Sequence, residues 1–233
     1  MRRAVLVVSL ILVLPGLFAA PATAQEALPP PPGAISGVEL VGNLPEATQA
    51  TAINFLEYGR GRGQRNVMVV TGRFGLKTYD LADPAAPLLL DELTSEELKL
   101  PGDVTGTFWQ NEDMDVDQRR KLVFMARDPR AYDGTTANPA SVSGVYIVDA
   151  RDPADLRLVT FHEVPAGHTS TCINDCDFLW TGGPASSTEQ QPAYPGGRPI
   201  WVTDIRDPHH PRTYPTPIDL GRDDGVNAYA HDV

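Results

Sequence analysis

Apolar residues recur along this chain in short runs separated by turn residues, which is the pattern of β-strands. Residues 66–93 hold one such group: runs at 67–70, 76–81 and 88–93, with a tight connection at 72–75. Runs of this length bounded by Gly, Pro and Asp are typical of strands. The pattern therefore predicts many short strands and few long helices.

One short sequence follows a predicted strand three times. D-x-x-D-P occupies residues 80–84, 149–153 and 204–208. Proline sets φ at its turn position, and the Asp before it can accept a backbone N–H, so this sequence predicts a turn for a physical reason. A fixed turn after a strand at three places indicates a repeated structural unit.

A further strand is predicted ahead of each unit. Four three-residue segments have a polar residue in the middle, flanked by apolar residues or by a residue in the place of one: 53–55, 114–116, 176–178 and 231–233. This alternation is expected in a strand, where successive side chains face opposite sides of the sheet. Four strands in simple up-and-down order form a β-propeller blade. An eight-stranded sandwich is the main alternative, but a sandwich rarely repeats one turn in register.

We therefore expect an all-β fold, a β-propeller of four-stranded antiparallel blades at about residues 50–93, 112–164 and 175–220, with a fourth blade beginning near 230. Three blades and a stub cannot close a ring, and an open blade leaves strand edges unpaired. The expected chain is thus an N-terminal fragment of a longer propeller. Three blades supplied by each of two chains is the alternative.

The N-terminus resembles an export signal. Arg2 and Arg3 precede an apolar stretch at 4–14, and residues 22–24 (ATA) have the small-x-small form of a signal-peptidase site. The alternative is an uncleaved membrane anchor, but the stretch is short for a span. We expect a signal peptide at 1–24, a Pro-rich leader at 25–36 and the partial propeller at 37–233. The mature protein would be extracytoplasmic, secreted or surface-associated, with no stable membrane span.

The charge balance limits the partners. Nineteen Lys and Arg against 30 Asp and Glu give a formal net charge of −11 among 233 residues, and no Lys/Arg cluster stands out. A nucleic acid would meet net repulsion, so nucleic acid is excluded as an expected partner.

Residues 144–153 (GVYIVDARDP), with weaker copies at 75–84 and 199–208, resemble the LVIVD repeat of bacterial exported β-propellers. The resemblance extends over most of residues 50–233. It implies an extracytoplasmic or surface-associated propeller, and the family offers no agreed reaction to carry over. The third copy departs from the pattern, because its last strand, expected near 217–220, is rich in proline and should be an outer edge.

In a four-stranded meander, the loops between strands two and three open on the same face as the links between blades. The enlarged connections all fall there: insertions at 127–143 and 182–198, and links at 94–112, 165–175 and 221–230. Insertions on one face of a repeat scaffold usually mark a binding surface, and solvent-exposed decoration is the alternative. The candidate binding residues on this face are Trp109, Asp115, Tyr132, His168, Asp177, Tyr194, His231 and Asp232.

Aromatic residues in the enlarged loops have two interpretations. Trp109, Tyr132 and Tyr194 are either anchors for a partner or lids over apolar residues of their own loops. The sequence leaves both open.

The two cysteines, Cys172 and Cys176, are most economically a disulfide in an exported chain. The alternative is a metal site in which both thiolates act with His168 and His231, a set that soft copper would accept. An oxidising compartment weighs against free thiolates, so we expect no metal and no cofactor.

Asp113, Asp115 and Asp117 form D-x-D-x-D, but an EF-hand loop would need Gly and Glu where Gln118 and Phe124 stand. The calcium interpretation therefore fails.

Asp115, Asp177 and Asp232 are expected at equivalent blade positions. They either face a central channel or accept backbone N–H groups at blade corners, and the second interpretation is favoured.

The sequence contains none of the common catalytic or nucleotide-binding motifs considered below. The glycines of residues 59–63 lack the context of a dinucleotide fingerprint, and no G-x-S-x-G, H-E-x-x-H or phosphate loop is present. The leading hypothesis is a non-enzymatic binding module for a protein or glycan. The competing hypothesis is a metal-dependent propeller enzyme, an oxidoreductase or hydrolase, using His168, His231 and channel carboxylates, and a structural surface-layer role comes third.

Overall fold

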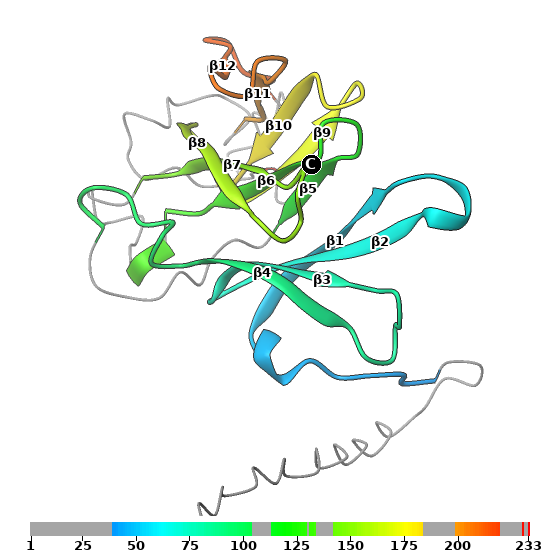
Figure 1. Cartoon of the computed structure of the whole chain (residues 1–233). Helices are drawn as coiled ribbons and strands as arrows, with labels where there is room; N and C mark the ends of the chain where they lie inside the picture. Colours follow the sequence, from blue (N-terminus) through cyan, green and yellow to red (C-terminus); the bar gives the residue numbers. More distant parts are fainter. Residues whose placement is uncertain are drawn as a thin grey trace, which may run out of the picture. The chain divides into compact units, whose positions relative to one another are not determined.

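The computed structural model describes residues 39–103, 113–129, 131–133, 142–183, 199–219, 230 and 233. In these residues the regular structure is β-strand apart from short 3-10 turns at Pro45–Ala47, Gly61–Gly63 and Ala131–Asp133 (Figure 1). The expected all-β fold is confirmed. Residues Val41–Val233 form one compact unit, to which the description below applies.

Three four-stranded antiparallel sheets follow one another along the chain. Sheet 1 contains β1 (Ala50–Tyr58), β2 (Arg65–Gly72), β3 (Gly75–Asp80) and β4 (Leu88–Thr94). Sheet 2 contains β5 (Met114–Asp117), β6 (Leu122–Arg127), β7 (Gly144–Asp149) and β8 (Arg157–Glu163). Sheet 3 contains β9 (Thr169–Ile173), β10 (Phe178–Gly182), β11 (Trp201–Asp204) and β12 (Arg212–Thr213). In each sheet the strands lie side by side in sequence order, as predicted.

The repeated D-x-x-D-P segments connect the third strand to the fourth in all three sheets. In sheet 2, Asp149 Oδ1 accepts the N–H of Arg151 at 2.9 Å, and Asp152 Oδ1 accepts that of Ala154 at 3.0 Å. The corresponding carboxylates of sheets 1 and 3 make the same bonds. The turn predicted from local chemistry is therefore confirmed at all three places.

The third sheet corrects two expectations. Its first strand is β9, Thr169–Ile173, and not 176–178, where Cys176 and Asp177 lie in the turn before β10. Its last strand is β12, Arg212–Thr213, rather than 217–220, where Ile218 makes an isolated bridge to Ile200. β12 lies at the edge of its sheet, as the prolines around it predicted.

Each sheet packs against the next. We call the face of a sheet that meets the following sheet its front, and the opposite face its back. The front of sheet 1 and the back of sheet 2 share one core, and the front of sheet 2 and the back of sheet 3 share another. The first core includes Leu56, Val69, Leu76, Met114, Val123, Met125 and Tyr146; the second includes Leu122, Phe124, Ile147, Leu179, Trp201 and Ile205.

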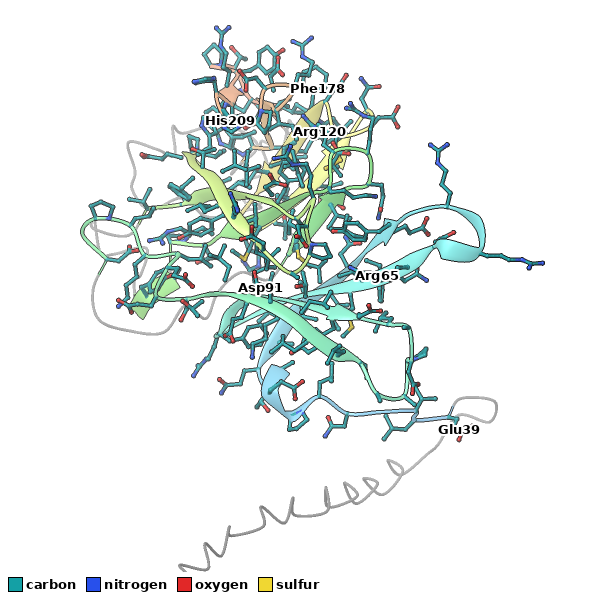
Figure 2. The ribbon with its side chains drawn as sticks, viewed as in Figure 1. Glu39, Arg65, Asp91, Arg120, Phe178 and His209 are labelled. Carbon is teal, nitrogen blue, oxygen red and sulfur yellow. A yellow bond between two sulfur atoms is a disulfide. The ribbon has the colours of Figure 1, made fainter. Side chains whose placement is uncertain are left out.

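Polar side chains also bridge adjacent sheets. Asp91 Oδ2 of β4 accepts the N–H of Leu156 at 2.6 Å, and Arg120 Nη1 of sheet 2 donates to the carbonyl of Ile205 at 2.6 Å. Figure 2 labels Asp91 and Arg120. These bonds tie each sheet to its neighbour's backbone, in an arrangement compatible with a propeller. Within the residues described, no helix has the length and apolar character needed to cross a membrane.

Candidate functional site

Two of the enlarged connections lie at the same end of sheet 2. The β6–β7 connection starts after Arg127 and returns at Gly144, and the link from β8 to β9 runs past both residues. A Cβ atom on Gly167 of that link would lie 1.9 Å from the carbonyl oxygen of Arg127 and 2.9 Å from the amide nitrogen of Gly144. The backbone of the link therefore packs directly on the base of the insertion.

Arg127 anchors this end of the sheet. Its side chain is 0% exposed and forms an ion pair with Asp103, which is 4% exposed and belongs to the link after β4. Arg127 Nη1 donates to Asp103 Oδ2 at 3.1 Å, and Nε donates to the carbonyl of Val142 at 2.7 Å. One guanidinium therefore holds together the β4–β5 link, the end of β6 and the last turn of the β6–β7 insertion.

Charge explains why the cation tolerates this burial. Burial by itself lowers the pKa of Arg127, but the neighbouring Tyr146 and Asp103, through charge and hydrogen bonds, outweigh it and raise the pKa. Arg127 Nη1 donates to the hydroxyl of Tyr146 at 2.5 Å. A buried charge that is paired and hydrogen-bonded remains ionised.

Aromatic rings surround the guanidinium. Its central carbon lies 5.1 Å from the ring centre of Tyr132, 5.8 Å from that of Tyr146 and 5.7 Å from that of Phe161, distances that allow cation–π attraction. The Tyr132 hydroxyl donates to the carbonyl of Ser95, and that of Tyr146 to the carbonyl of Leu98 at 2.7 Å. Burial raises the pKa of Tyr146 to about 12, so its hydroxyl keeps its proton. Tyr132 is 1% exposed, so its ring is not an exposed anchor.

His168 connects sheets 2 and 3 at this end. Its Nδ1 lies 3.0 Å from Asp128 Oδ2, and the two side chains are 3% and 0% exposed. The His168 N–H donates to the carbonyl of Gly182 at 3.1 Å. A carboxylate on Nδ1 fixes the orientation of an imidazole, as it does in many catalytic sites, but here both groups are buried.

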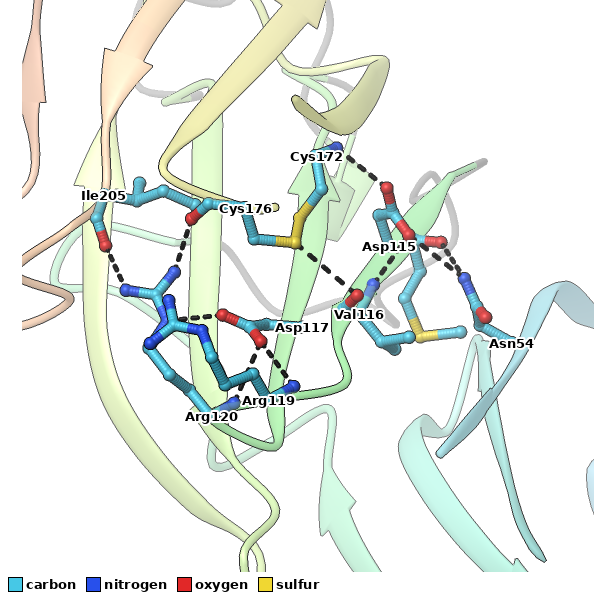
Figure 3. The surroundings of a disulfide bond; sticks show 10 residues. Asn54, Asp115, Val116, Asp117, Arg119, Arg120, Cys172, Cys176 and Ile205 are labelled. Atoms are coloured by element: carbon cyan, nitrogen blue, oxygen red, sulfur yellow. Dashed lines mark hydrogen bonds and ion pairs between the residues drawn. A yellow bond between two sulfur atoms is a disulfide. The ribbon is translucent and has the colours of Figure 1, made fainter. Parts of the chain in front are cut away.

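Asp115 is occupied by backbone and amide contacts. Its Oδ2 accepts the N–H of Cys172 at 2.7 Å, and its Oδ1 accepts from Asn54 Nδ2 at 3.3 Å and from the N–H of Val116 at 2.8 Å (Figure 3). Its neighbour Asp113 likewise accepts the N–H of Ser170 at 3.0 Å. Asp113, just before β5, and Asp115 of β5 therefore both bond the backbone of β9. Asp115 accepts backbone N–H groups, as its favoured interpretation expected.

Asp177 does not lie where the sequence placed it. It occupies the β9–β10 turn, at the opposite end of sheet 3 from His168, and its carbonyl accepts the N–H of Ile205 at 3.0 Å. The strand registers make Thr171, not Asp177, the equivalent of Asp115, because Ile173 pairs with Phe178 as Asp117 pairs with Leu122. The expectation that Asp177 joins the insertion face is wrong.

The disulfide lies at the Asp177 end. Cys172 and Cys176 are bonded, with Cα atoms 4.6 Å apart, so the interpretation as free thiolate ligands of a metal is wrong. Asn174, Asp175 and Cys176 have φ of 56°, 54° and 59°, which makes a left-handed turn of three consecutive non-glycine residues. Arg120 Nη2 holds this turn from sheet 2 by donating to the Cys176 carbonyl at 2.5 Å.

Four predicted residues, Trp109, Tyr194, His231 and Asp232, lie outside the described residues. Within the part of the chain that is described, no three His, Cys, Asp or Glu side chains form a group suited to a metal ion.

Sequence reasoning missed Asp103, Arg127 and Asp128. An Arg-Asp pair that ends an apolar run looks like a solvated strand end, and only the fold reveals that it is buried.

Comparison with known proteins adds no relative. No protein-family model matches the chain, and no curated protein matches it significantly. The fold and site define an all-β protein built from repeated four-stranded antiparallel sheets, with a buried polar cluster where its enlarged connections meet.

Proposed function

We propose that this protein is an exported or surface-associated β-propeller-type binding module, which presents its insertion end to a protein or glycan partner. The observation that carries the proposal is the set of contacts made by the buried Arg127 side chain. Arg127 binds Asp103 of one enlarged connection and the Val142 carbonyl of another, so both connections rise from one fixed base.

A fixed base favours recognition for an energetic reason. When a partner orders a flexible binding loop, the loop loses conformational entropy, which weakens binding. Anchoring the ends of the loop in the free protein reduces this loss. Functional loops on a rigid scaffold are the usual arrangement in repeat folds. His168 extends the same platform toward sheet 3 through Asp128 and Gly182.

Two further observations support the class and location proposed. Successive sheets pack front to back with equivalent turns, which is how LVIVD-like propeller blades would be arranged. The disulfide is typical of an oxidising compartment, in agreement with the signal-like N-terminus.

Binding can be tested on arrays of glycans and of cell-surface proteins, with the purified chain as probe. Tyr132→Phe removes the hydroxyl that holds Ser95 but keeps the ring beside Arg127, so the fold should persist while the β4–β5 link loosens. We expect weaker binding to every ligand the parent protein recognises. Arg157→Ala, at the opposite end of sheet 2, is the matched control and should bind like the parent. Failure of the parent protein to bind any arrayed ligand, or equal binding by both variants, would contradict the proposal.

The metal-dependent enzyme remains the second candidate, because a carboxylate-oriented imidazole such as Asp128–His168 is a common supporting element of metal and catalytic sites. Metal analysis of the purified protein and of His168→Gln separates the two. A stoichiometric transition metal that His168→Gln loses would favour the enzyme. A metal-free protein that still binds its partner would favour the binding module.

A further inference from the structure

Six basic residues lie in two turns at the end of the sheets opposite the insertions. They are Arg60, Arg62 and Arg65 in and beside the β1–β2 hairpin, and Arg119, Arg120 and Lys121 in the β5–β6 turn. Residues 57–65 and 117–121 contain only two acidic residues, Glu57 and Asp117. The two groups are far apart in the sequence, so the fold is needed to reveal this concentration of positive charge in a chain of net charge −11.

Direct contacts join the two turns. Gln118 Oε1 of the β5–β6 turn accepts the N–H of Glu57 of β1 at 3.1 Å. The ring of Tyr58 contacts cations from both turns: its centre lies 5.8 Å from the central guanidinium carbon of Arg65 and 5.2 Å from Nζ of Lys121. The two turns therefore form one continuous surface.

Most of this positive charge is not neutralised. Arg65 lies 3.5 Å from Asp80, and Arg120 pairs with Asp117. In the part of the chain that the structure describes, no carboxylate pairs with the other four residues, which we call the basic patch: Arg60, Arg62, Arg119 and Lys121. Like charges gathered without counter-ions repel one another, so a bound anion would stabilise them. At physiological ionic strength, charges more than about 8 Å away are largely screened, so the basic patch outweighs the net charge in contact with an anion.

The β5–β6 turn also borders an open cavity of ≈ 320 Å³, which it shares with the β9–β10 turn. Gln118 and Arg119 line the cavity from sheet 2, and Asp175 lines it from sheet 3. Asp175 is exposed, and among the described residues its carboxylate has no hydrogen-bond or ion-pair partner. A carboxylate and a guanidinium at one cavity offer an acceptor and a donor for hydroxyl groups. The volume is at the small end of ligand sites and suits one sugar unit.

The turn that carries Asp175 is held in an unfavourable backbone conformation. Asn174, Asp175 and Cys176 are all left-handed, with φ of 56°, 54° and 59°. Such strain in non-glycine residues is concentrated at functional sites. The disulfide to Cys172 and the bond from Arg120 to the Cys176 carbonyl hold the turn in place (Figure 3). The position of Asp175 beside the cavity is thus fixed before a ligand binds.

We propose that this end of the protein binds an acidic polysaccharide. The basic patch binds carboxylate or sulfate groups along the polymer, and Gln118, Arg119 and Asp175 bind the hydroxyl groups of one sugar unit in the cavity. Three of the four residues of the basic patch are arginines, whose planar guanidinium binds such acid groups bidentately. Asp175 favours a glycan over other polyanions, because it repels any polyanion that has no hydroxyl group to donate to it. This inference goes beyond the proposed function and does not depend on it, and it is tested in solution, separately from the arrayed ligands of the insertion end.

Isothermal titration calorimetry of the full chain at physiological ionic strength tests the proposal. We expect saturable binding of polygalacturonate and of heparin, none of neutral dextran, and weaker binding as salt is added. Arg62→Gln should lower the affinity roughly fivefold, because it removes one charged contact on an exposed turn. Arg73→Gln is the matched control: Arg73 is an exposed arginine of the β2–β3 connection, at the insertion end, and its variant should bind like the parent.

Asp175→Gly gives the sharpest result. Glycine adopts a φ of 54° without strain, so the turn keeps its shape while the carboxylate is lost. Loss of a negative charge strengthens binding of a ligand held by charge alone. Polysaccharide binding should instead weaken, by at least about threefold, because the sugar hydroxyl groups lose their acceptor. Inorganic polyphosphate is the comparison probe, and it should bind Asp175→Gly at least as tightly as the parent.

Several outcomes would overturn the proposal. They are a parent protein that binds neither acidic polysaccharide, a folded Arg62→Gln that binds like the parent, and a folded Asp175→Gly that binds the polysaccharides as tightly as the parent or more tightly. Tighter binding to phosphatidylglycerol vesicles or to duplex DNA than to both polysaccharides would also overturn it. Circular dichroism of each variant verifies that it is folded.

Discussion

Arg127 and Asp103 form a buried ion pair between the end of β6 and the link that follows β4, with Nη1 and Oδ2 3.1 Å apart. The two residues are far apart in sequence, and neither lies in a motif. Their pairing brings two enlarged connections to one point on the protein and fixes the base from which both extend.

Breaking this pair should strongly destabilise the fold. Arg127→Met removes the charge but keeps much of the side-chain volume, and it leaves Asp103 buried without its partner. The free energy of unfolding should fall by about 3 to 5 kcal/mol, the usual range when one member of a buried pair is removed. Urea denaturation followed by tryptophan fluorescence measures the change.

Arg157→Ala supplies the control for that measurement. Arg157 also pairs with a carboxylate, Asp155, but the two side chains are 72% and 52% exposed. Solvent screening makes such a pair nearly neutral to stability, so the midpoint should not move measurably. Equal effects of the two substitutions would show that the Arg127 pair is not buried as described.

The disulfide should stabilise the β9–β10 turn by reducing the entropy of the unfolded chain. Cys172 and Cys176 close a loop of five residues, for which the chain-entropy estimate is about 2 kcal/mol. We expect the double variant Cys172→Ser/Cys176→Ser to lose stability of that order in urea denaturation. The parent protein in reductant should show the same loss, while the double variant should not respond to reductant. A reductant effect on the variant would mean that the loss has another origin.

The parts of this fold that depend on local chemistry could be predicted from the sequence. The Asp-Pro turns are an example, because Asp149 and Asp152 bond N–H groups only two residues away. The disulfide pairing could also be predicted, since the chain has two cysteines four positions apart.

What the sequence could not show depends on distant neighbours. β9 begins Thr-Ser-Thr, which lacks the apolar alternation used to find strands, and it is held by the Asp113 and Asp115 carboxylates of another sheet. The Cys-Asp-Phe segment shows that alternation without forming a strand, so the sequence pattern places Asp177 at the wrong end of the blade. The burial of Arg127 could not be recognised in the sequence, because its partner Asp103 is 24 residues away and meets it only after two sheets have packed.

Gly167 should be intolerant of any side chain. A Cβ atom at this position would lie 1.9 Å from the Arg127 carbonyl oxygen, a backbone atom that cannot move without disturbing the β6–β7 pairing. Gly167→Ala should therefore cost at least about 2 kcal/mol of stability, as overpacking against backbone does. Thermal unfolding followed by circular dichroism reports the loss.

Gly63→Ala is the control for Gly167. A Cβ atom on Gly63 would have no atom within 4 Å, so the melting temperature should stay close to that of the parent protein. A Gly167→Ala variant as stable as Gly63→Ala would show that the link does not pack on the insertion base.

Stability should fall when the solution is made mildly acidic, because of His162. Burial lowers the pKa of His162 from its ordinary value of 6.5, and its Nε2 lies 2.9 Å from Thr213 Oγ1 of sheet 3. The unfolded chain therefore takes up a proton at this residue at a higher pH than the folded protein does. The free energy of unfolding must decrease as pH falls below about 6.5, until the folded-state pKa is passed.

Urea denaturation between pH 7.5 and 5.5 measures how the free energy of unfolding changes with pH. This slope should be shallower for His162→Gln, which cannot take up the proton. His209→Gln, altered in an exposed turn, is the control and should retain the parent slope. Parallel slopes for the parent and His162→Gln would show that the partly buried imidazole of His162 does not control this pH response.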